Sequence, residues 1–156
     1  MTAVTSPADL ANTLRLSITR LARRMRQESD ARLTPTQIAA LATVDRHGPL
    51  PLGALAEEEQ IGAPTVTKIV DKLHAAGLVE RLPDPDDRRV TRIAATPSGR
   101  TLLDEIRERK TAWLATRLAE LDAEDLATLT AAAEVLERLA AAPKPATPRD
   151  HEADAP

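Results

Sequence analysis

The stretch GAPTVTKIVDKLHAAGLVERLPDPDDRRVTRIAATPSGR, residues 62–100, carries the signals that decide the fold. Its first part predicts a helix, because Pro64 suits the first helical turn, where a missing N–H group costs no hydrogen bond. Apolar side chains then recur at helical spacing, at Val66, Ile69, Val70 and Leu73. Gly77 is typical of a helix end. The β-branched runs at 79–82 and 90–95 predict two strands, so we expect a helix followed by a hairpin.

The loop between the two strands, residues 83–90, is charged, contains two prolines and lacks glycine. Short hairpin loops usually use Gly or Asn. One explanation is a solvated loop in which the aspartates neutralise Arg88 and Arg89, an exposed pairing that contributes about 0–1 kcal/mol. The other is a loop built to present an arginine, with the neighbouring acids holding its guanidinium in place. We favour the second, because several acids beside two arginines would weaken a general attraction for phosphate.

The segments before this stretch are predicted to be helical. Trp113 is the sole aromatic residue of the chain, so the core must consist of Leu, Ile, Val and Ala, which favours packed helices. Residues 10–25 have an apolar stripe at helical spacing. A second helix begins at Thr34, where Gln37 completes a capping box, and ends at Gly48.

Three further helices and one short strand complete the expected order. Residues 50–52 are strand-like, and a short helix extends from them to Glu59. Thr96 begins a long helix after the hairpin, and Asp122 caps a last one. This order predicts a mainly α fold, a winged helix-turn-helix with an α/β wing and with N- and C-terminal dimerisation helices.

The outer helices have apolar faces that a domain of about 65 residues is too small to cover. A second copy of the chain could cover them, which predicts a homodimer. We therefore expect four regions: an N-terminal helix that contributes to dimerisation at 1–32, a winged helix-turn-helix DNA-binding domain at 33–98, C-terminal dimerisation helices at 99–142 and a proline-rich, disordered tail at 143–156.

Composition limits the class of protein. The 156 residues are 42% hydrophobic and 29% charged, with a net charge of −3. The lack of cysteine excludes disulfides, thiolate metal ligands and thiol-based redox sensing. No apolar run reaches ~18 residues and no signal-peptide pattern begins the sequence, so we expect no membrane partner and a cytoplasmic location. The net charge argues against nucleic-acid binding, but basic residues are concentrated at 14–32 and 60–100.

Three pieces of the sequence together resemble the MarR family of bacterial transcriptional regulators: KLHAAGLVER at 72–81, DPDDRR at 84–89 and TPSGR at 96–100. The resemblance extends from about residue 10 to residue 139. It implies a homodimer on a pseudo-palindromic site in double-stranded DNA, with one recognition helix per subunit in the major groove and the wings in the flanking minor grooves. It also implies a repressor that a small anionic or aromatic effector releases from DNA.

On the expected recognition helix, 64–76, the resemblance implies DNA contacts by Pro64, Thr65 and Lys68. The apolar stripe also leaves Thr67 and Lys72 exposed, and hydroxyl and ammonium groups suit base edges and phosphates. This face has no Arg, Asn or Gln for bidentate reading of bases, so base specificity is expected to be modest or to depend on DNA shape. Asp71 is expected to pair with Lys68 or Lys72.

On the expected wing, 83–90, the resemblance implies that Arg89 is the tip arginine and that Asp87 orients it. Arg88 and Arg92 are expected to contact phosphates beside it. An ordinary solvated surface is the alternative explanation for both elements. The position of the helix directly before the hairpin favours contact with DNA.

Other polar clusters lack the pattern of a catalytic or metal site. Glu57–Glu59 have no accompanying nucleophile, metal-ligand pattern or glycine-rich loop, which indicates a solvated helix end. His47, His74 and His151 show no ligand spacing. The sequence therefore predicts no enzyme, no metal and no cofactor. The alternative function is a winged-helix module that binds ligands or proteins without binding DNA specifically.

The sequence does not identify the residues of a ligand pocket. The lack of Tyr and Phe disfavours an aromatic-lined pocket, and the arginine-rich first helix favours an anion as the effector. Trp113 is expected in the core or in dimer packing.

Overall fold

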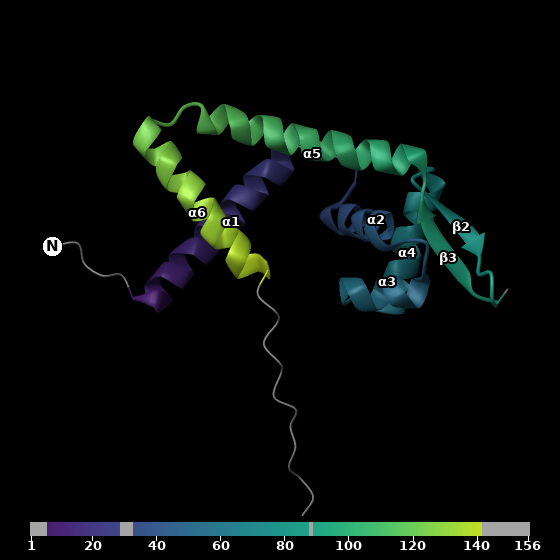
Figure 1. The fold of residues 1–156 in the computed structure, drawn as a ribbon. Coiled ribbons are helices and arrows are strands. Elements are labelled where there is room, and N and C mark those ends of the chain that lie inside the picture. Colours follow the sequence, from purple (N-terminus) through teal and green to yellow (C-terminus); the bar gives the residue numbers. More distant parts are fainter. Residues whose placement is uncertain (1–5, 29–32, 88, 142–156) are drawn as a thin grey trace, which may run out of the picture. The chain divides into compact units, whose positions relative to one another are not determined.

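The computed structural model describes residues 6–28, 33–87 and 89–141 (Figure 1). Its elements are, in chain order, α1 (Pro7–Glu28), α2 (Pro35–His47), β1 (Leu50–Pro51), α3 (Leu52–Glu59), α4 (Ala63–Ala75), β2 (Val79–Pro83), β3 (Thr91–Ala95), α5 (Pro97–Leu118) and α6 (Ala123–Ala141). The chain divides into two compact units, Met1–Thr116 and Arg117–Pro156. The fold class predicted from the sequence is confirmed: the protein is mainly helical, with a hairpin wing after the fourth helix.

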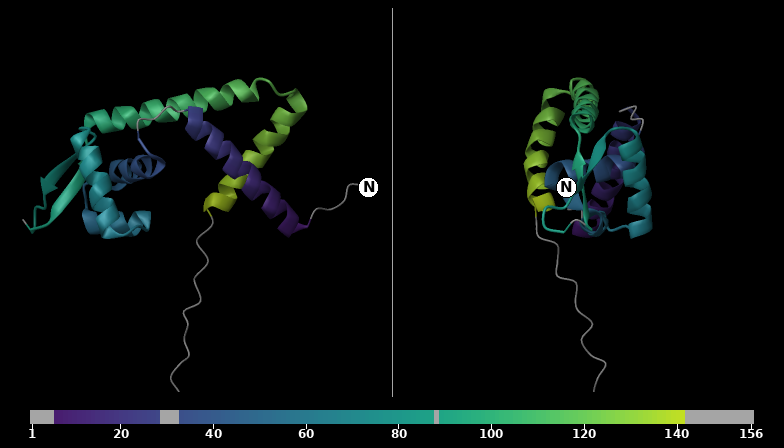
Figure 2. Two further views of the ribbon diagram at one scale, coloured as in Figure 1. Left: turned by 180° about the vertical axis from the view of Figure 1, so that it is seen from behind. Right: turned by 90° about the vertical axis from the view of Figure 1, so that its right-hand side faces the viewer.

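The hydrophobic core of the first unit lies among α2, α3, α4 and a small sheet. Four side chains, one from each of α2, α3, α4 and β3, are fully buried: Leu41, Leu55, Leu73 and Ile93. The same three helices pack on one another in all views, and the β2–β3 hairpin projects from them (Figures 1 and 2). The core therefore fixes the helix and the hairpin that form the candidate site.

The start of α2 has the capping box that the sequence predicts. The Thr34 hydroxyl accepts the N–H of Gln37 at 3.3 Å, and the Gln37 side chain accepts the N–H of Thr34 at 2.8 Å. Two donors at the helix start are thereby satisfied. Ala40, Leu41 and Val44 then face the core, and Gly48 caps the helix end.

The end of α4 forms a Schellman turn. The N–H of Gly77 donates to the carbonyl of His74, and the N–H of Leu78 donates to the carbonyl of Leu73, both at 2.9 Å. Gly77 has φ +70°, a conformation that favours glycine. The predicted buried stripe is confirmed, at Val66, Ile69, Val70 and Leu73. The turn sends the chain directly from α4 into β2.

The sheet is antiparallel, with strand order β1-β3-β2. Leu50 pairs with Ile93 on one side of β3, and Val79 pairs with Ala95 on the other. The strand-like segment predicted at 50–52 is shorter in the structure, because Leu52 already begins α3. β1 thus ties the helices to the base of the wing.

Thr96 connects the start of α5 to the end of α4. Its hydroxyl accepts the N–H of Gly99 at 3.1 Å and donates to the carbonyl of Gly77 at 2.6 Å. Gly99 packs so closely that a Cβ atom there would lie 2.2 Å from the carbonyl oxygen of Leu78. Helix α5 therefore starts in contact with the turn that ends α4.

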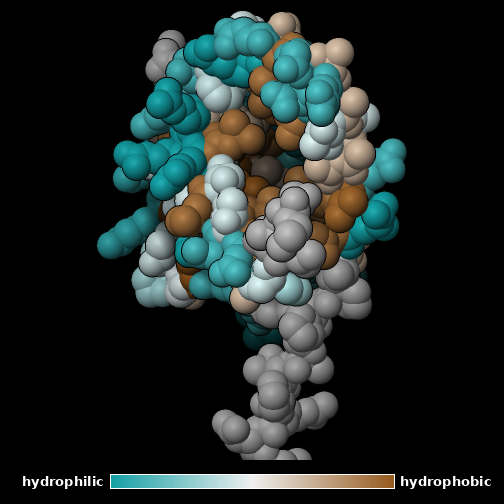
Figure 3. All heavy atoms as spheres, turned by 90° about the vertical axis from the view of Figure 1, so that its left-hand side faces the viewer, coloured by the Kyte–Doolittle hydropathy of each residue, from teal (hydrophilic) through white to brown (hydrophobic). Residues whose placement is uncertain are grey.

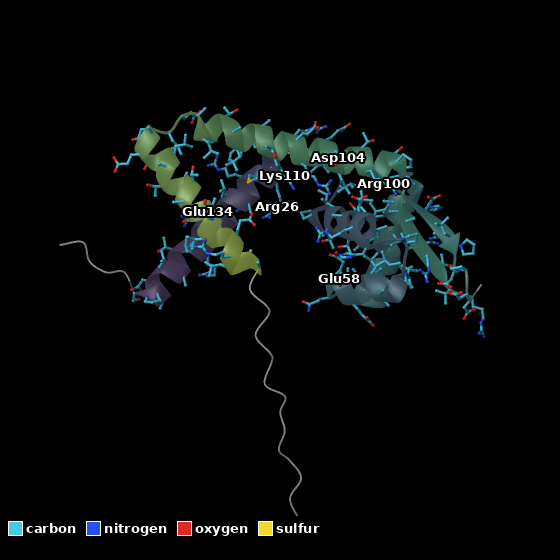
Figure 4. The ribbon with its side chains drawn as sticks, in the orientation of Figure 1. Arg26, Glu58, Arg100, Asp104, Lys110 and Glu134 are labelled. Carbon is cyan, nitrogen blue, oxygen red and sulfur yellow. The ribbon has the colours of Figure 1, made fainter. Side chains whose placement is uncertain are left out.

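Further along, α5 is held to α2 by charge. Asp45 of α2 lies 3.3 Å from Arg100 and 3.8 Å from Arg107, and Arg107 also contacts Asp104 at 2.7 Å. Arg100 and Asp104 lie on the first turns of α5 in Figure 4. Leu103 of α5 joins the hydrophobic core, so both ion pairs and apolar packing fix this part of the helix.

Helices α1 and α6 contain no buried residue among those described. The large hydrophobic side chains that are exposed all lie in α1, α6 or the turn before α6: Leu10, Leu16, Ile18, Leu21, Leu121, Leu126, Leu129, Val135, Leu136 and Leu139. Figure 3 shows hydrophobic side chains open to the surface on the face that it draws. Asp122 caps α6 as predicted, accepting the N–H of Asp125 at 2.8 Å.

The predicted tail and the predicted division of the chain into four regions are not tested by the structure. The tail predicted at 143–156 lies outside the described residues, and the four-region division of the chain stays a prediction. Among the described helices, none has both the length and the apolar character that a membrane span requires.

The close contact at Gly99 gives a test of the α4–α5 junction. We expect Gly99→Ala to destabilise the protein by roughly 1–3 kcal/mol, because the added methyl group must displace the Leu78 carbonyl. Gly53→Ala in α3 is the control, since no atom lies within 4 Å of a Cβ there. It should be neutral or stabilising by up to about 1 kcal/mol, as helix propensity predicts. Urea unfolding of the two variants measures this, and equal stabilities would contradict the tight junction.

Candidate nucleic-acid interface

The exposed face of α4 lies opposite its buried stripe. At about 100° per residue, the line directly opposite the stripe contains Pro64, Lys68, Asp71 and Ala75. The other predicted contact residues flank that line and are also exposed: Thr65, Thr67 and Lys72. All the residues predicted on this helix therefore share one solvent-facing surface.

The polar groups on this surface differ in how far they are already engaged. The Thr67 hydroxyl donates to the carbonyl of Ala63 at 2.9 Å, within its own helix. Lys68 and Lys72 form no ion pair with any residue in the described part of the chain. Their ammonium groups are available for an anionic partner.

Asp71 pairs with Arg81 of β2, in a short contact between Oδ1 and Nη2. The expectation that it pairs with Lys68 or Lys72 is wrong. Arg81 follows Val79 by two residues in β2, so both side chains lie on the same side of the strand, and Val79 is buried. That alternation is the signal in the sequence from which the contact of Arg81 with α4 could have been inferred.

The wing loop is built around Asp84, which is only 7% exposed. One carboxylate oxygen accepts the N–H groups of Asp86 and Asp87 at 2.8 and 3.0 Å, and the other accepts Nε of Arg92 at 2.5 Å. The hydrogen bond from Arg92, followed by those from the two backbone N–H groups, lowers the pKa of Asp84 to about 2. A carboxylate therefore organises the loop in place of the glycine that short hairpins use.

The sequence did not single out Asp84 for this role. Asp84 entered only the less favoured explanation, in which the aspartates of the loop neutralise Arg88 and Arg89, and the structure pairs it with Arg92. The available signal was the Asp-Pro-Asp order, because an aspartate often accepts the N–H group two residues later in a turn.

The tip of the wing carries the predicted contact between Asp87 and Arg89. Oδ1 of Asp87 accepts the backbone N–H of Arg89 at 3.0 Å and its Nε at 3.2 Å, and Oδ2 lies 3.5 Å from Nη2. The Arg89 side chain is nevertheless 92% exposed. The carboxylate thus restrains the direction of the guanidinium while leaving most of it open to solvent.

The two other wing arginines of the prediction differ in placement. Arg88 lies outside the described residues. Arg92 lies at the base of the wing, where it pairs with Asp84 and its Nη1 lies 3.5 Å from the carbonyl oxygen of Pro49. Arg92 therefore supports the loop from within, and its predicted contact with a phosphate stays a prediction.

The glutamates and histidines for which the sequence predicts no catalytic or metal-binding role lie apart from the candidate interface or outside the described residues, or belong to α2 and α4. Glu57 and Glu58 are exposed at the end of α3, where Figure 4 labels Glu58, and Glu59 accepts a hydrogen bond from Thr43 at 2.5 Å. Within the described ranges, no group of His, Asp or Glu residues has the arrangement of a metal site. His151 lies outside those ranges.

A second cationic feature lies on α1. A hollow of about 340 Å³ is lined by Arg20, Arg23, Arg24 and Gln27. Arg23 and Arg24 lie three and four positions after Arg20, and Gln27 lies four and three positions after them, so the four residues share one face of the helix. None of the three arginines forms an ion pair with a residue in the described part of the chain.

Comparison with known proteins identifies the same arrangement elsewhere. The model of the MarR family matches residues 33–91. An HTH-type transcriptional regulator of Mycobacterium bovis is 33% identical over 132 residues, which cover 84% of this chain and 92% of that protein. A solved structure of a transcriptional regulator from Pseudomonas aeruginosa is 32% identical, with a TM-score of 0.78 over 88% of this chain and 99% of that one. A variant of Staphylococcus aureus MepR, solved bound to an oligodeoxyribonucleotide, shares the fold at 22% identity, with a TM-score of 0.67 over 83% of this chain and 97% of that one.

The role of Asp84 predicts a defined pH dependence. Its folded pKa of about 2 lies below the ordinary 3.8. The charged carboxylate therefore stabilises the folded state fully above about pH 4, and this contribution is lost as the pH falls through about 2. We expect Asp84→Asn to be less stable than the wild type at pH 7, and the difference in free energy of unfolding to shrink across this window. Urea unfolding between pH 2 and 7 measures it.

Arg92→Gln provides the second arm of that test, because it removes the same ion pair from the other side. It should reduce the pH dependence in the same window. If both variants keep the full wild-type loss of stability between pH 4 and 2, Asp84 does not organise the loop through its charge.

Proposed function

The chain belongs to the MarR family of helix-turn-helix transcriptional regulators, and we propose that it acts as a homodimeric repressor that a small ligand releases from a pseudo-palindromic DNA site. Membership in this family makes it a DNA-binding transcriptional regulator and confirms the prediction that it is not an enzyme. The dimer, the repression and the release by a ligand are parts of the proposal.

The observation that carries the proposal is the restrained, exposed Arg89 at the tip of the wing. The narrow minor groove attracts a guanidinium by its negative potential. An arginine that is already oriented loses less conformational freedom when it enters the groove. The fork with Asp87 supplies this restraint, and the wing loop that Asp84 organises holds the fork.

The exposed face of α4 suits the neighbouring major groove. Lys68 and Lys72 provide cations for phosphates, and Thr65 provides a hydroxyl near the helix start for a base edge. A MepR variant with the same fold has been solved bound to an oligodeoxyribonucleotide, which supports DNA as the partner. With α4 in the major groove, Lys68 and Lys72 can contact phosphates, and with the wing in the minor groove, Arg89 can enter it. These two placements account for the exposed cations predicted on the described part of α4 and the wing tip.

A dimer accounts for the exposed apolar side chains of α1 and α6. Monomeric proteins rarely expose large contiguous apolar surfaces, and a second copy of the chain is the simplest partner that covers them. Two copies related by a two-fold axis present two recognition helices, which requires an inverted repeat in the DNA.

The arginine face of α1 suits an anionic effector. Like charges three or four residues apart destabilise a helix by about 0.2–0.5 kcal/mol per pair, and an anion in the hollow would relieve this repulsion. The arginines lie off the stripe formed by residues 10, 14, 18, 21 and 25, so burial of that stripe in a dimer leaves them accessible, although the exposed Leu16 shares their face. The effector is therefore proposed to carry carboxylate or phosphate groups.

The proposal is tested by selection of binding sites from random duplex DNA with the purified full-length protein. It predicts enrichment of an inverted repeat whose half-sites lie about 10 base pairs apart. The alternative, a winged-helix module for ligands or proteins, predicts no enriched site.

On the selected site, Arg89→Ala should weaken binding roughly ten-fold and reduce the slope of log K against log salt concentration by about one, because one cationic contact is lost. Titrations at several salt concentrations measure both quantities. Arg109→Ala is the control, since Arg109 pairs with Glu105 on α5, outside α4 and the wing. Unchanged affinity and slope for Arg89→Ala would remove the wing tip from the interface.

The effector is tested by adding citrate or inorganic phosphate at constant ionic strength. We expect one of them to weaken DNA binding by the wild type and to have much less effect on the double variant Arg23→Gln, Arg24→Gln. Arg15→Gln, also on α1 but outside the hollow, should respond as the wild type does. An equal response of all three proteins would exclude the arginine face as the site.

A further inference from the structure

Asp71 occupies an unexpected position for a DNA-binding helix. Its side chain lies in the line of α4 directly opposite the buried stripe, between Lys68 and Ala75. A free carboxylate there would face the phosphates of any DNA that approaches this surface, and like charges repel. The carboxylate is not free, however, because Arg81 contacts its Oδ1 atom.

Arg81 reaches this position from a different element. β2 leaves α4 through the turn at Gly77, and Arg81 lies on the side of the strand that carries the buried Val79. Its side chain is 38% exposed, so the guanidinium lies at the edge of the surface that α4 presents. Arg81 is thus a cation of the wing strand held beside the recognition helix.

The contact with Asp71 engages one nitrogen atom of the Arg81 guanidinium. A guanidinium has five N–H donors in a planar fork, and the contact with Asp71 uses Nη2. Arginine binds carboxylate on one edge and phosphate on another because these donors point in different directions. The contact with Asp71 therefore leaves donors of Arg81 for a partner that approaches the edge of α4.

We propose that Arg81 is a further DNA-contacting residue and that Asp71 is its positioning residue. Arg81 contacts a backbone phosphate at the edge of the major groove, and Asp71 holds its guanidinium beside α4 for that contact. This inference rests on the proposed function. It means that Asp71, although acidic, favours DNA binding through Arg81.

Two other roles predict different results. If the pair only joins α4 to β2, it affects stability and not the number of phosphates contacted. If Asp71 reads a base, it accepts a hydrogen bond from the amino group of cytosine. Its removal then changes the preference at one base pair of each half-site while leaving the salt dependence unchanged.

The experiment compares DNA binding by four full-length variants on the site selected by the wild type: Arg81→Ala, Asp71→Ala, Asp71→Asn and Arg109→Ala. The readouts are the dissociation constant, the salt slope and the preference at each base pair. Thermal unfolding confirms that each variant is folded. Arg109→Ala is the matched control, because it breaks an exposed arginine–carboxylate pair on α5.

We expect Arg81→Ala to weaken binding roughly ten-fold and to reduce the salt slope by about one. Asp71→Ala should also weaken binding, although it removes a negative charge from the DNA-facing surface. Asp71→Asn should restore most of the affinity, since the amide oxygen still accepts a hydrogen bond from Arg81. The control should bind as the wild type does.

Three results would overturn the inference. Tighter binding by Asp71→Ala would mean that Asp71 only repels DNA, and an unchanged slope for Arg81→Ala would mean that Arg81 contacts no phosphate. A changed base preference without a changed slope would assign Asp71 to base reading. Failure of the proposed function is distinguishable, because the wild type itself would then select no site.

Discussion

The contact between the end of α4 and the start of α5 is the constraint on which the arrangement of the candidate site depends. Thr96 donates to the carbonyl of Gly77, and Gly99 leaves no room for a side chain against Leu78. The recognition helix, the first wing strand and the long helix therefore meet within a few residues. A shift of α5 at this point must move the turn from which β2 departs. The position of α5 is therefore coupled to that of the candidate interface.

Charge pairing explains how a chain with a net charge of −3 suits DNA. Three aspartates near the candidate interface each contact an arginine: Asp71 with Arg81, Asp84 with Arg92, and Asp87 with Arg89. These aspartates restrain the arginines that they contact, and the pairing offsets the repulsion that a free carboxylate would exert on DNA phosphates. Exposed ion pairs contribute little to stability. The exposed pairs Asp71–Arg81 and Asp87–Arg89 therefore serve mainly to orient the two arginines. The pair of Asp84 is different, because its carboxylate is nearly buried and also accepts two backbone N–H groups.

The features that the sequence predicted well are local ones. The stripe of α4, the capping box at Thr34 and the turn at Gly77 each depend on residues within about one helical turn. The fork of Asp87 and Arg89 spans two residues and was predicted as well. The pairs of Arg92 and Arg81 span eight and ten residues. The first depends on the pairing of β2 with β3 and the second on the packing of β2 beside α4, so residue spacing alone did not identify them. The order of the elements followed from these local signals taken together, and the resemblance to a family added the expected placement of α4 and the wing on DNA.

In the proposed complex, two copies of the chain hold an inverted repeat, with the recognition helices in the inner major grooves and the wing arginines in the outer minor grooves. Hydroxyl-radical footprinting on the selected site tests it most directly, because these radicals cleave DNA from the minor groove. The proposed complex should give two protected minor-groove segments placed symmetrically on either side of the repeat, and both should be lost with Arg89→Ala while the protein remains bound. Protection on one side only, or outer protection that persists in Arg89→Ala, would contradict it.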